Sequence, residues 1–261
     1  MTAAVDRTFA VLELLSRHPK GLSVQAVALS LAIVPSATHR LLNDLVRLGY
    51  ASQSADQGTY ALTLRLAATG LSWLGRSGIH DVAQPVLDAL ALQSGELVRL
   101  SVADGDRLIW VAVAQGAVSG LRYDPAREQG LAASLAYSAS GRAWAATLPE
   151  EQALALVAQQ GLTAPDGAGA GADLTLPQVQ DVLAHTRSTG HAEAADCFLA
   201  GMAAVAVALQ SNGASPGCLS IAGPTARLTP ARRAALLPGL RNAAAELMAL
   251  APASGLLRGQ A

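Results

Sequence analysis

Hydrophobic residues in the first sixty positions recur at helical spacing and then change to the pattern of a short β-hairpin. The repeats predict three helices, at 6–17, 24–31 and 35–48. A hairpin is predicted to follow them, with its turn at 54–58 and its last strand at 60–62. The first helix is expected to turn three residues inward, Phe9, Leu12 and Leu15. Ser23 suits the N-cap of the second helix, and Pro35 suits the first turn of the third.

The third of these helices has an apolar face and a polar face. Its apolar stripe is Leu41, Leu45 and Leu48, widened by Leu42 and Val46. The opposite face carries five polar residues three or four positions apart, Ser36, His39, Arg40, Asn43 and Arg47. Such a face suits a helix in the DNA major groove. Any amphipathic surface helix also has a polar face, so the complete order of elements is what favours a winged helix-turn-helix.

The rest of the chain mixes helices and strands without the regular alternation of a parallel βαβ fold. We predict helices at 64–76, 79–93, 141–148, 149–161, 176–189 and 229–250. We predict strands at 97–103, 107–114, 203–210 and 218–222, with a further one possible at 119–123. The Gly/Ala-rich segment 164–173 is expected to be a mobile surface loop. The fold class predicted for the chain is α+β, with an antiparallel sheet in its second domain.

These patterns divide the chain into two domains and a connection. The expected boundaries are 1–63 for the winged helix-turn-helix, 64–78 for a linker helix, 79–252 for the second domain and 253–261 for a disordered tail. Trp73 in the linker helix could face a partner or pack on the second domain.

Composition limits where the protein can act. About half of the residues are apolar, at 51%, but they never form a run of about twenty without charges, so no membrane span is expected. The start of the chain is a poor signal peptide because Asp6, Arg7 and Glu13 interrupt it. Two cysteines, Cys197 and Cys218, give no disulfide framework. We therefore expect a cytoplasmic protein.

Charge is distributed unevenly between the two parts of the chain. The first 75 residues hold six basic and four acidic residues, and the remainder holds twelve basic and fifteen acidic residues. Phosphate neutralisation dominates affinity for DNA, so one domain with so small a positive surplus would bind feebly. A dimer, which doubles the basic contacts, is therefore implied if this domain reads DNA.

Several stretches resemble the IclR family of bacterial transcriptional regulators. In the first half they are RTFAVLELLSRHPKGLSVQAVALSL, PSATHRLLNDLVRLGY and the wing ending in Tyr60-Ala61-Leu62. In the second half they are VLDALALQSGELVRLSVADGDRLIWV, YSASGRAWAATLPEE and LSIAGPTARLTPAR. The resemblance implies a winged helix-turn-helix, a linker helix and a GAF-like effector-binding domain. It also implies a non-enzymatic regulator, a repressor more often than an activator, that binds operator DNA as a dimer or dimer of dimers.

The resemblance also assigns DNA contacts. They are Gln25, Ser36, Ala37, Thr38, His39, Arg40, Asn43, Gln57 and Gly58. Hydroxyls and the N–H groups at the helix start would hold phosphates, and Arg40 would reach a guanine edge. Thr38 could instead pack in the core, and His39 could cap a neighbouring group.

The effector site assigned by resemblance departs from the family pattern. Its residues are Leu121, Tyr123, Leu135, Tyr137, Ala139, Ser140, Gly141, Ala194, Ala204, Ser220 and Ala222, with Trp110 as a further wall. Backbone N–H groups at 139–141 would hold a carboxylate. Alanines at 194, 204 and 222 replace an acid, a cysteine and a serine. The depleted pocket predicts a bulky, partly apolar organic acid, such as an aromatic acid, and a short keto acid is the alternative.

The sequence offers little support for a metal site, an enzyme or a pure interaction module. The residues His191, Asp196 and Cys197 are of metal-ligating types, but their spacing fits no compact site, so we expect no metal and no cofactor. A hydrolytic enzyme would need a base near Ser140, and neither His80 nor His185 has a recognisable relation to it. A pure interaction module would not require the polar face of 36–43.

Overall fold

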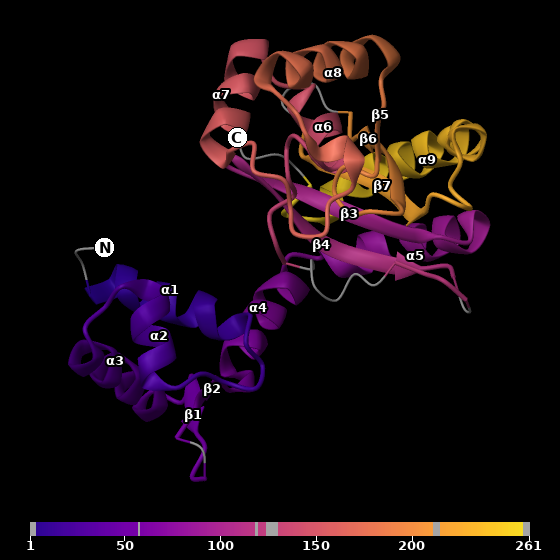
Figure 1. Cartoon of the computed structure of the whole chain (residues 1–261). Coiled ribbons are helices and arrows are strands. Elements are labelled where there is room, and N and C mark those ends of the chain that lie inside the picture. Colours follow the sequence, from indigo (N-terminus) through magenta and orange to yellow (C-terminus); the bar gives the residue numbers. More distant parts are fainter. Residues whose placement is uncertain (1–3, 57, 118–119, 124–129, 211–214, 258–261) are drawn as a thin grey trace. The chain divides into compact units, whose positions relative to one another are not determined.

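The computed structural model describes residues 4–56, 58–117, 120–123, 130–210 and 215–257, and it divides the chain into two compact units, 1–76 and 77–261 (Figure 1). The helix predicted as a linker is the last element of the first unit. Among the helices described, none combines the length and apolar character needed to cross a membrane.

The first unit is built from the elements that the sequence predicts. They are α1 (Ala4–Ser16), α2 (Val24–Leu31), α3 (Pro35–Arg47), β1 (Ala51–Gln53), β2 (Tyr60–Leu62) and α4 (Leu64–Arg76). The Ser23 hydroxyl caps α2 by accepting a 3.2 Å hydrogen bond from the Ala26 amide. Gly49 follows α3 with a φ of 78°, a conformation that suits glycine at the end of a helix. Local capping chemistry therefore sets the start of α2 and the end of α3.

The core of this unit lies between the three helices and the hairpin. It is formed by Val11, Leu12, Leu15, Val27, Leu41, Leu42, Leu45, Ala51 and Tyr60. Phe9, which we expected to face inward, is 60% exposed. Leu48, predicted as part of the buried stripe, and Val46, predicted to widen it, are both exposed. Because α3 ends at Arg47, Leu48 is its C-cap and leaves the face that packs on the core.

The second unit places an antiparallel sheet between helices. Its larger elements are α5 (Ile79–Ser94), β3 (Leu97–Asp104), β4 (Arg107–Gln115), α6 (Ala139–Ala145), α7 (Glu150–Gln160), α8 (Leu176–Thr189), β5 (Ala192–Ala195), β6 (Met202–Ala208), β7 (Gly217–Pro224) and α9 (Pro230–Leu250). Within the described residues the strand order is β4-β3-β7-β6-β5. Helices α5 and α9 pack on one face, and α6, with α7 and α8 beyond it, covers the other (Figure 1).

The sheet face below α6 is rich in small side chains. Ala222 and Ser220 of β7 lie opposite Ala204 and Ala206 of β6, and Ala194 of β5 lies opposite Ala204. On the other side Arg99 of β3 pairs with Ser220, so all of these side chains share one face. Small residues leave space between this face and the helix that covers it, and that space is the pocket described below.

The structure of this unit differs from the sequence prediction in four places. β5 was not predicted at all, and the stretch 120–123 forms no strand. The loop 164–173 was expected to be mobile, but the Gly171 amide donates to Asp196 O and Gly167 O accepts from the Ala200 amide. The tail was expected to be disordered from residue 253, yet Ser254 and Leu257 are buried. The last four residues of that tail lie outside the described part.

Candidate nucleic-acid interface and effector pocket

The polar face of α3 is formed by five exposed side chains, Ser36, His39, Arg40, Asn43 and Arg47. The Asn43 amide nitrogen lies 3.4 Å from the ring nitrogens of His39, and its oxygen accepts a 3.3 Å hydrogen bond from the Tyr60 hydroxyl. Asn43 is therefore oriented by the hairpin. Arg47, on the same face, is engaged with Asp44 at 3.1 Å.

Thr38, which was assigned to the DNA interface, is fully buried. Its hydroxyl donates a 3.2 Å hydrogen bond to Val34 O, one turn earlier. A side chain with no exposed surface cannot reach a phosphate, so this assignment is wrong. Thr38 packs under the helix start instead, and Ala37 beside it is half-buried.

The remaining DNA-contact candidates lie on α2 and in the wing. Gln25 is exposed in the first turn of α2. Gly58 has a φ of 61°, and its amide donates to Ser54 O at 3.1 Å, which closes the hairpin turn. Gln57, at the tip, falls outside the described residues.

The C-terminal end of α3 is tied to the start of α4. The Thr63 hydroxyl donates to Gly49 O at 2.6 Å, and the Arg65 guanidinium donates to Leu48 O at 2.6 Å. The same guanidinium stacks on the Tyr50 ring, 5.1 Å from its centroid. Arg65, one of the basic residues of this unit, thus binds the C-terminal end of α3. Together with Thr63 it links α3 to the start of α4.

The second unit contains a small pocket with a cavity volume of about 20 Å³, which lies in a partly solvent-open hollow of about 320 Å³. Its walls come from β3, β5, β6, β7, the start of α6 and the loops 120–123 and 196–201. The lining residues are Arg99, Tyr123, Ser138, Ala139, Ala194, Phe198, Leu199, Met202, Ala203, Ala204 and Ala222. Of the effector residues assigned from the sequence, the structure therefore brings together Tyr123, Ala139, Ala194, Ala204 and Ala222.

Arg99 supplies the positive charge of this pocket. The guanidinium carbon lies 4.7 Å from the Trp110 ring centroid and 5.1 Å from that of Tyr123. Trp110 also meets Phe198 edge-to-face, with 5.7 Å between centroids. A guanidinium held between aromatic rings in a buried site suits recognition of a carboxylate with an apolar body.

Other residues assigned to the effector site lie beside the pocket rather than in its lining. Ser140 and Ser220 are buried, and their hydroxyls form no hydrogen bond to any described residue. The Gly141 amide, proposed to hold a carboxylate, donates to the Ser138 hydroxyl at 2.9 Å. A Cβ at Gly141 would lie 2.0 Å from Ser134 O, so glycine is needed for the close approach of α6 to that backbone.

The larger side chains assigned to the pocket point elsewhere. Leu135 belongs to the core below α7. The Tyr137 hydroxyl donates to Leu162 O at 2.7 Å, and burial, together with the nearby Asp173, raises the pKa of this phenol. Leu121 is 70% exposed. The sequence thus identified the alanine wall and Tyr123 but misplaced three apolar residues.

Sequence reasoning missed Arg99, Ser138 and the 198–202 part of the wall. One signal was present, because Arg99 interrupts the apolar run of β3, where a charge is unexpected unless the structure engages it. Phe198, Leu199 and Met202 follow β5, the strand that the sequence did not reveal.

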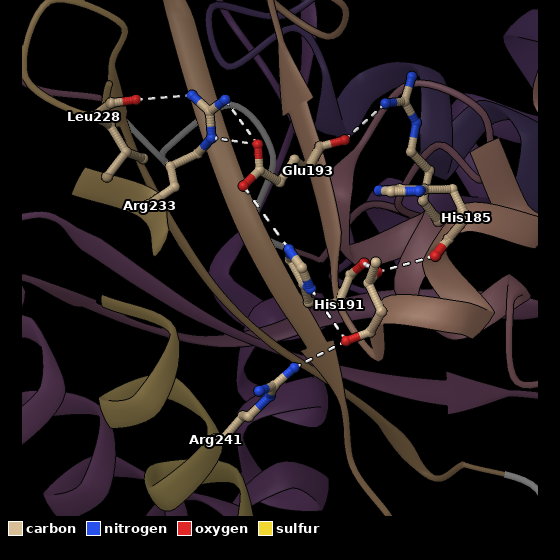
Figure 2. A network of polar contacts seen from close by, with 8 residues as sticks. His185, His191, Glu193, Leu228, Arg233 and Arg241 are labelled. Atoms are coloured by element: carbon tan, nitrogen blue, oxygen red, sulfur yellow. Dashed lines mark hydrogen bonds and ion pairs between the residues drawn. The ribbon is translucent and has the colours of Figure 1, made fainter. Parts of the chain in front are cut away.

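The residues considered for a metal site take part in separate contacts. His191 contacts Thr189 O and the Glu193 carboxylate, while Arg241 reaches Thr189 O from α9 (Figure 2). Asp196 accepts from the Gly201 amide, and the Cys197 thiol donates to Ala195 O. Within the described ranges no three His, Cys, Asp or Glu side chains form a group able to hold a metal ion.

A winged helix-turn-helix unit joined to an α+β domain with an internal pocket defines a DNA-binding regulator that responds to a small molecule. Comparison with known families gives the same class. The IclR helix-turn-helix domain matches residues 4–55, and the bacterial transcriptional regulator IclR C-terminal domain matches 71–249. The chain belongs to the IclR family of transcriptional regulators, which is not a family of enzymes.

Characterised relatives resemble nearly the full chain. The acetate operon repressor of Salmonella typhimurium is 28% identical over 230 residues, which cover 88% of this chain and 82% of the relative. The HTH-type transcriptional repressor AllR of Escherichia coli K12 is 25% identical over the same length and covers 88% and 83%.

Solved structures share the fold. The IclR regulator of Alicyclobacillus acidocaldarius has a TM-score of 0.78 at 22% identity and covers 94% of this chain and 97% of its own. An IclR homologue of Microbacterium hydrocarbonoxydans, solved as a complex with 4-hydroxybenzoate, has a TM-score of 0.73 at 20% identity and covers 99% and 100%.

Proposed function

We propose that this protein is a repressor of a catabolic operon whose effector is a small organic acid with an aromatic or otherwise bulky, apolar body. The observation that carries the proposal is the composition of the pocket, where a buried guanidinium lies between aromatic rings against a wall of alanines. Arg99 would pair with the carboxylate, and Ala194, Ala204 and Ala222 would leave room for the body.

The chemistry of the wall favours an apolar body over a short polar one. A site that recognises a small polar acid needs donors and acceptors placed around every polar atom of the ligand. In this pocket the positions that would supply such donors and acceptors are alanines, and Phe198, Leu199 and Met202 add further apolar surface. The 4-hydroxybenzoate complex of the Microbacterium homologue supports an aromatic acid. The names of the Salmonella and Escherichia relatives support repression.

On the DNA side, we propose that Arg40 reads a base edge while Ser36 and the N-terminal turn of α3 hold phosphates. Arg40 is exposed on α3, and the neighbouring Asn43 is oriented by Tyr60. A bidentate arginine–guanine contact is the commonest specific contact in the major groove. Gln25 and the wing would add backbone contacts, as expected from the family.

The functional unit is proposed to be a dimer or a dimer of dimers that acts in the cytoplasm, where its operator lies. The small basic surplus of the first unit requires two copies for firm DNA binding. Three large apolar side chains of α4, Leu64, Leu71 and Trp73, are each at least 60% exposed, which favours contact with a partner.

The regulatory step is proposed to be a shift between two arrangements of the effector domains. Because Thr63 and Arg65 join α3 to α4, any movement of the linker helix would carry the recognition helix with it. The spacing of the two recognition helices would then differ between the arrangements, and so would affinity for a palindromic operator.

Calorimetry with the purified full chain tests the effector class. Benzoate and 4-hydroxybenzoate should bind, and two- or three-carbon keto acids should bind at least about tenfold more weakly. Gel shifts with and without the acid then measure how the ligand changes operator affinity. Tight binding of a short keto acid, with none of an aromatic acid, would overturn the proposed effector class.

A further inference from the structure

Arg227, in the turn between β7 and α9, joins two segments that are far apart in the sequence. Its Nε and Nη2 atoms donate to the two carboxylate oxygens of Glu96, each at 2.7 Å, and its Nη1 atom donates to Leu121 O at 2.6 Å. One guanidinium therefore holds a buried carboxylate with one edge and a loop backbone with the other. Such a planar fork is geometry that lysine cannot reproduce.

Contacts other than the ion pair with Arg227 also hold Glu96 in place. It is 5% exposed, and its backbone carbonyl accepts a 3.0 Å hydrogen bond from the Gly116 amide. On β7 a Cβ at Gly223 would lie 2.4 Å from the Glu96 carboxylate, so a larger residue there would require the Glu96 side chain to move. The ion pair with Glu96 thus orients the Arg227 guanidinium toward the loop that contains Leu121.

The loop held by this contact carries one wall of the pocket. Leu121 is two residues before Tyr123, whose ring lies against the Arg99 guanidinium at 5.1 Å. A second contact, from the Gln115 amide group to Tyr123 O at 2.8 Å, holds the other side of the same segment. Leu121 itself is exposed, so it is the backbone contact to Arg227, rather than burial of its side chain, that fixes this position.

The turn that contains Arg227 also supports the opposite wall. The carbonyl of the next residue, Leu228, accepts a 2.9 Å hydrogen bond from Arg233 of α9. Arg233 in turn binds the Glu193 carboxylate at 2.7 Å, beside the pocket residue Ala194 (Figure 2). Both sides of the pocket are therefore tied to the short segment where β7 passes into α9.

We propose that Arg227 is a positioning residue of the effector pocket. By holding Leu121 O while paired with Glu96, it keeps Tyr123 stacked on Arg99 and so maintains the aromatic cage around the guanidinium. The inference rests on the proposed function only in that the pocket takes an organic acid. It predicts that ligand affinity depends on a residue that does not line the pocket.

Truncation of Arg227 alone is a poor test, because it would leave the buried Glu96 carboxylate without its cation. The double variant Glu96→Gln/Arg227→Gln removes both charges and shortens the side chain that reaches Leu121. Arg227→Lys is the second variant, since it keeps the charge but cannot form the fork and the third bond together. Arg241→Gln is the matched control, because this arginine also donates to a carbonyl, Thr189 O, away from the loop.

Two measurements on the full chain follow, once thermal melting shows each variant to be folded. Nitration by tetranitromethane, located by mass spectrometry, reports the exposure of Tyr123, which is 5% in the structure. Calorimetry with benzoate reports the affinity of the pocket. In both Arg227 variants we expect Tyr123 to be nitrated at least about tenfold faster and benzoate to bind at least about tenfold more weakly. The Arg241 control should match the wild type in both.

Each other result decides against one of the two proposals. The positioning role is overturned if Tyr123 remains protected in a folded Arg227 variant, or if it becomes exposed while benzoate affinity stays within about twofold. If the wild type binds no organic acid, the proposed effector class fails. The nitration rates alone then decide whether Arg227 positions Tyr123.

Discussion

The guanidinium of Arg99 stacks on the indole of Trp110, with 4.7 Å between the guanidinium carbon and the ring centroid. The two residues lie on adjacent strands, and a register shift after Leu100 places Trp110 opposite Ser101. The irregularity turns the indole toward Arg99 on the pocket face. The charged side chain in the middle of this apolar strand thereby contacts aromatic surface, and it lines the pocket proposed for the effector.

Replacement of Arg99 should remove acid binding. In Arg99→Gln we expect affinity for benzoate to fall by roughly thirtyfold, equivalent to about 2 kcal/mol, because a charge-assisted contact to the carboxylate is lost. Calorimetry measures this change. Arg107→Gln, an equal change of charge at an exposed site of the same domain, should leave affinity as it is. If Arg99→Gln binds benzoate as tightly as the wild type, Arg99 does not bind the carboxylate of the ligand.

The alanine wall should determine which acids fit. Ala222→Ser adds a hydroxyl to the pocket, so aromatic acids should bind several-fold more weakly relative to short keto acids. A panel of both acid classes, titrated against wild type and variant, gives the ratio of affinities. Ala206→Ser, on the same sheet face but in the core, should lower stability without altering that ratio. A ratio that fails to move would separate Ala222 from ligand selection.

Arg40 should specify the operator. Arg40→Ala is expected to cost about 1–3 kcal/mol of specific binding and to relax selectivity at one base pair, while acid binding is retained. Gel shifts against operator variants at several salt concentrations separate this effect from loss of a phosphate contact. Arg17→Ala, the same charge change at another exposed position of this domain, should affect all sequences equally. Retained selectivity in the Arg40 variant would exclude it from readout.

Thr38 should matter for stability alone. Thr38→Val keeps the shape of the buried side chain and removes its hydrogen bond to Val34 O, so the free energy of unfolding should fall by less than about 1 kcal/mol. Denaturant melts measure this change, and gel shifts should show unchanged operator selectivity. A selective loss of operator binding in a stable variant would show that Thr38 contributes to the DNA interface.

The thiol of Cys218 should react only after unfolding. Burial raises its pKa well above the ordinary value, so the reactive thiolate is scarce in the native state. In a Cys197→Ser background, which leaves Cys218 as the single thiol, labelling by a chromogenic disulfide should follow the global unfolding curve. Labelling at native conditions at the rate of a free thiol would show that the sheet face opens locally.

Much of the first unit could be predicted because its signals are local. The cap at Ser23, the proline at the start of α3 and the glycine after it act on residues within one helical turn. The same reason explains α4, α8 and α9, whose ends agree with the sequence prediction to the residue or nearly so. Phe9 and Leu48 failed because helical periodicity cannot tell which edge of an apolar stripe lies beyond the packed core.

Predictions failed in the second unit where long-range contacts decide the structure. β5 consists of alanines and a glutamate, residues with weak strand preference, and pairing with β6 is what makes it a strand. The loop 164–173 is held by a backbone some thirty residues away, and the segment 251–257 packs on the start of α5 through Ser77 and Gly78. The residue pattern within such short segments does not indicate which distant residues they contact.

The sequence by itself determined most of the elements, the family and the alanines that line the proposed effector pocket. Those properties follow from capping, periodicity and motifs that act over a few residues. Only the tertiary structure decided that Thr38 is buried, that Arg99 lies between Trp110 and Tyr123, and that Arg227 reaches Leu121. Strand register and loop docking set these relationships, because they join residues as much as 106 positions apart that the local pattern treats independently.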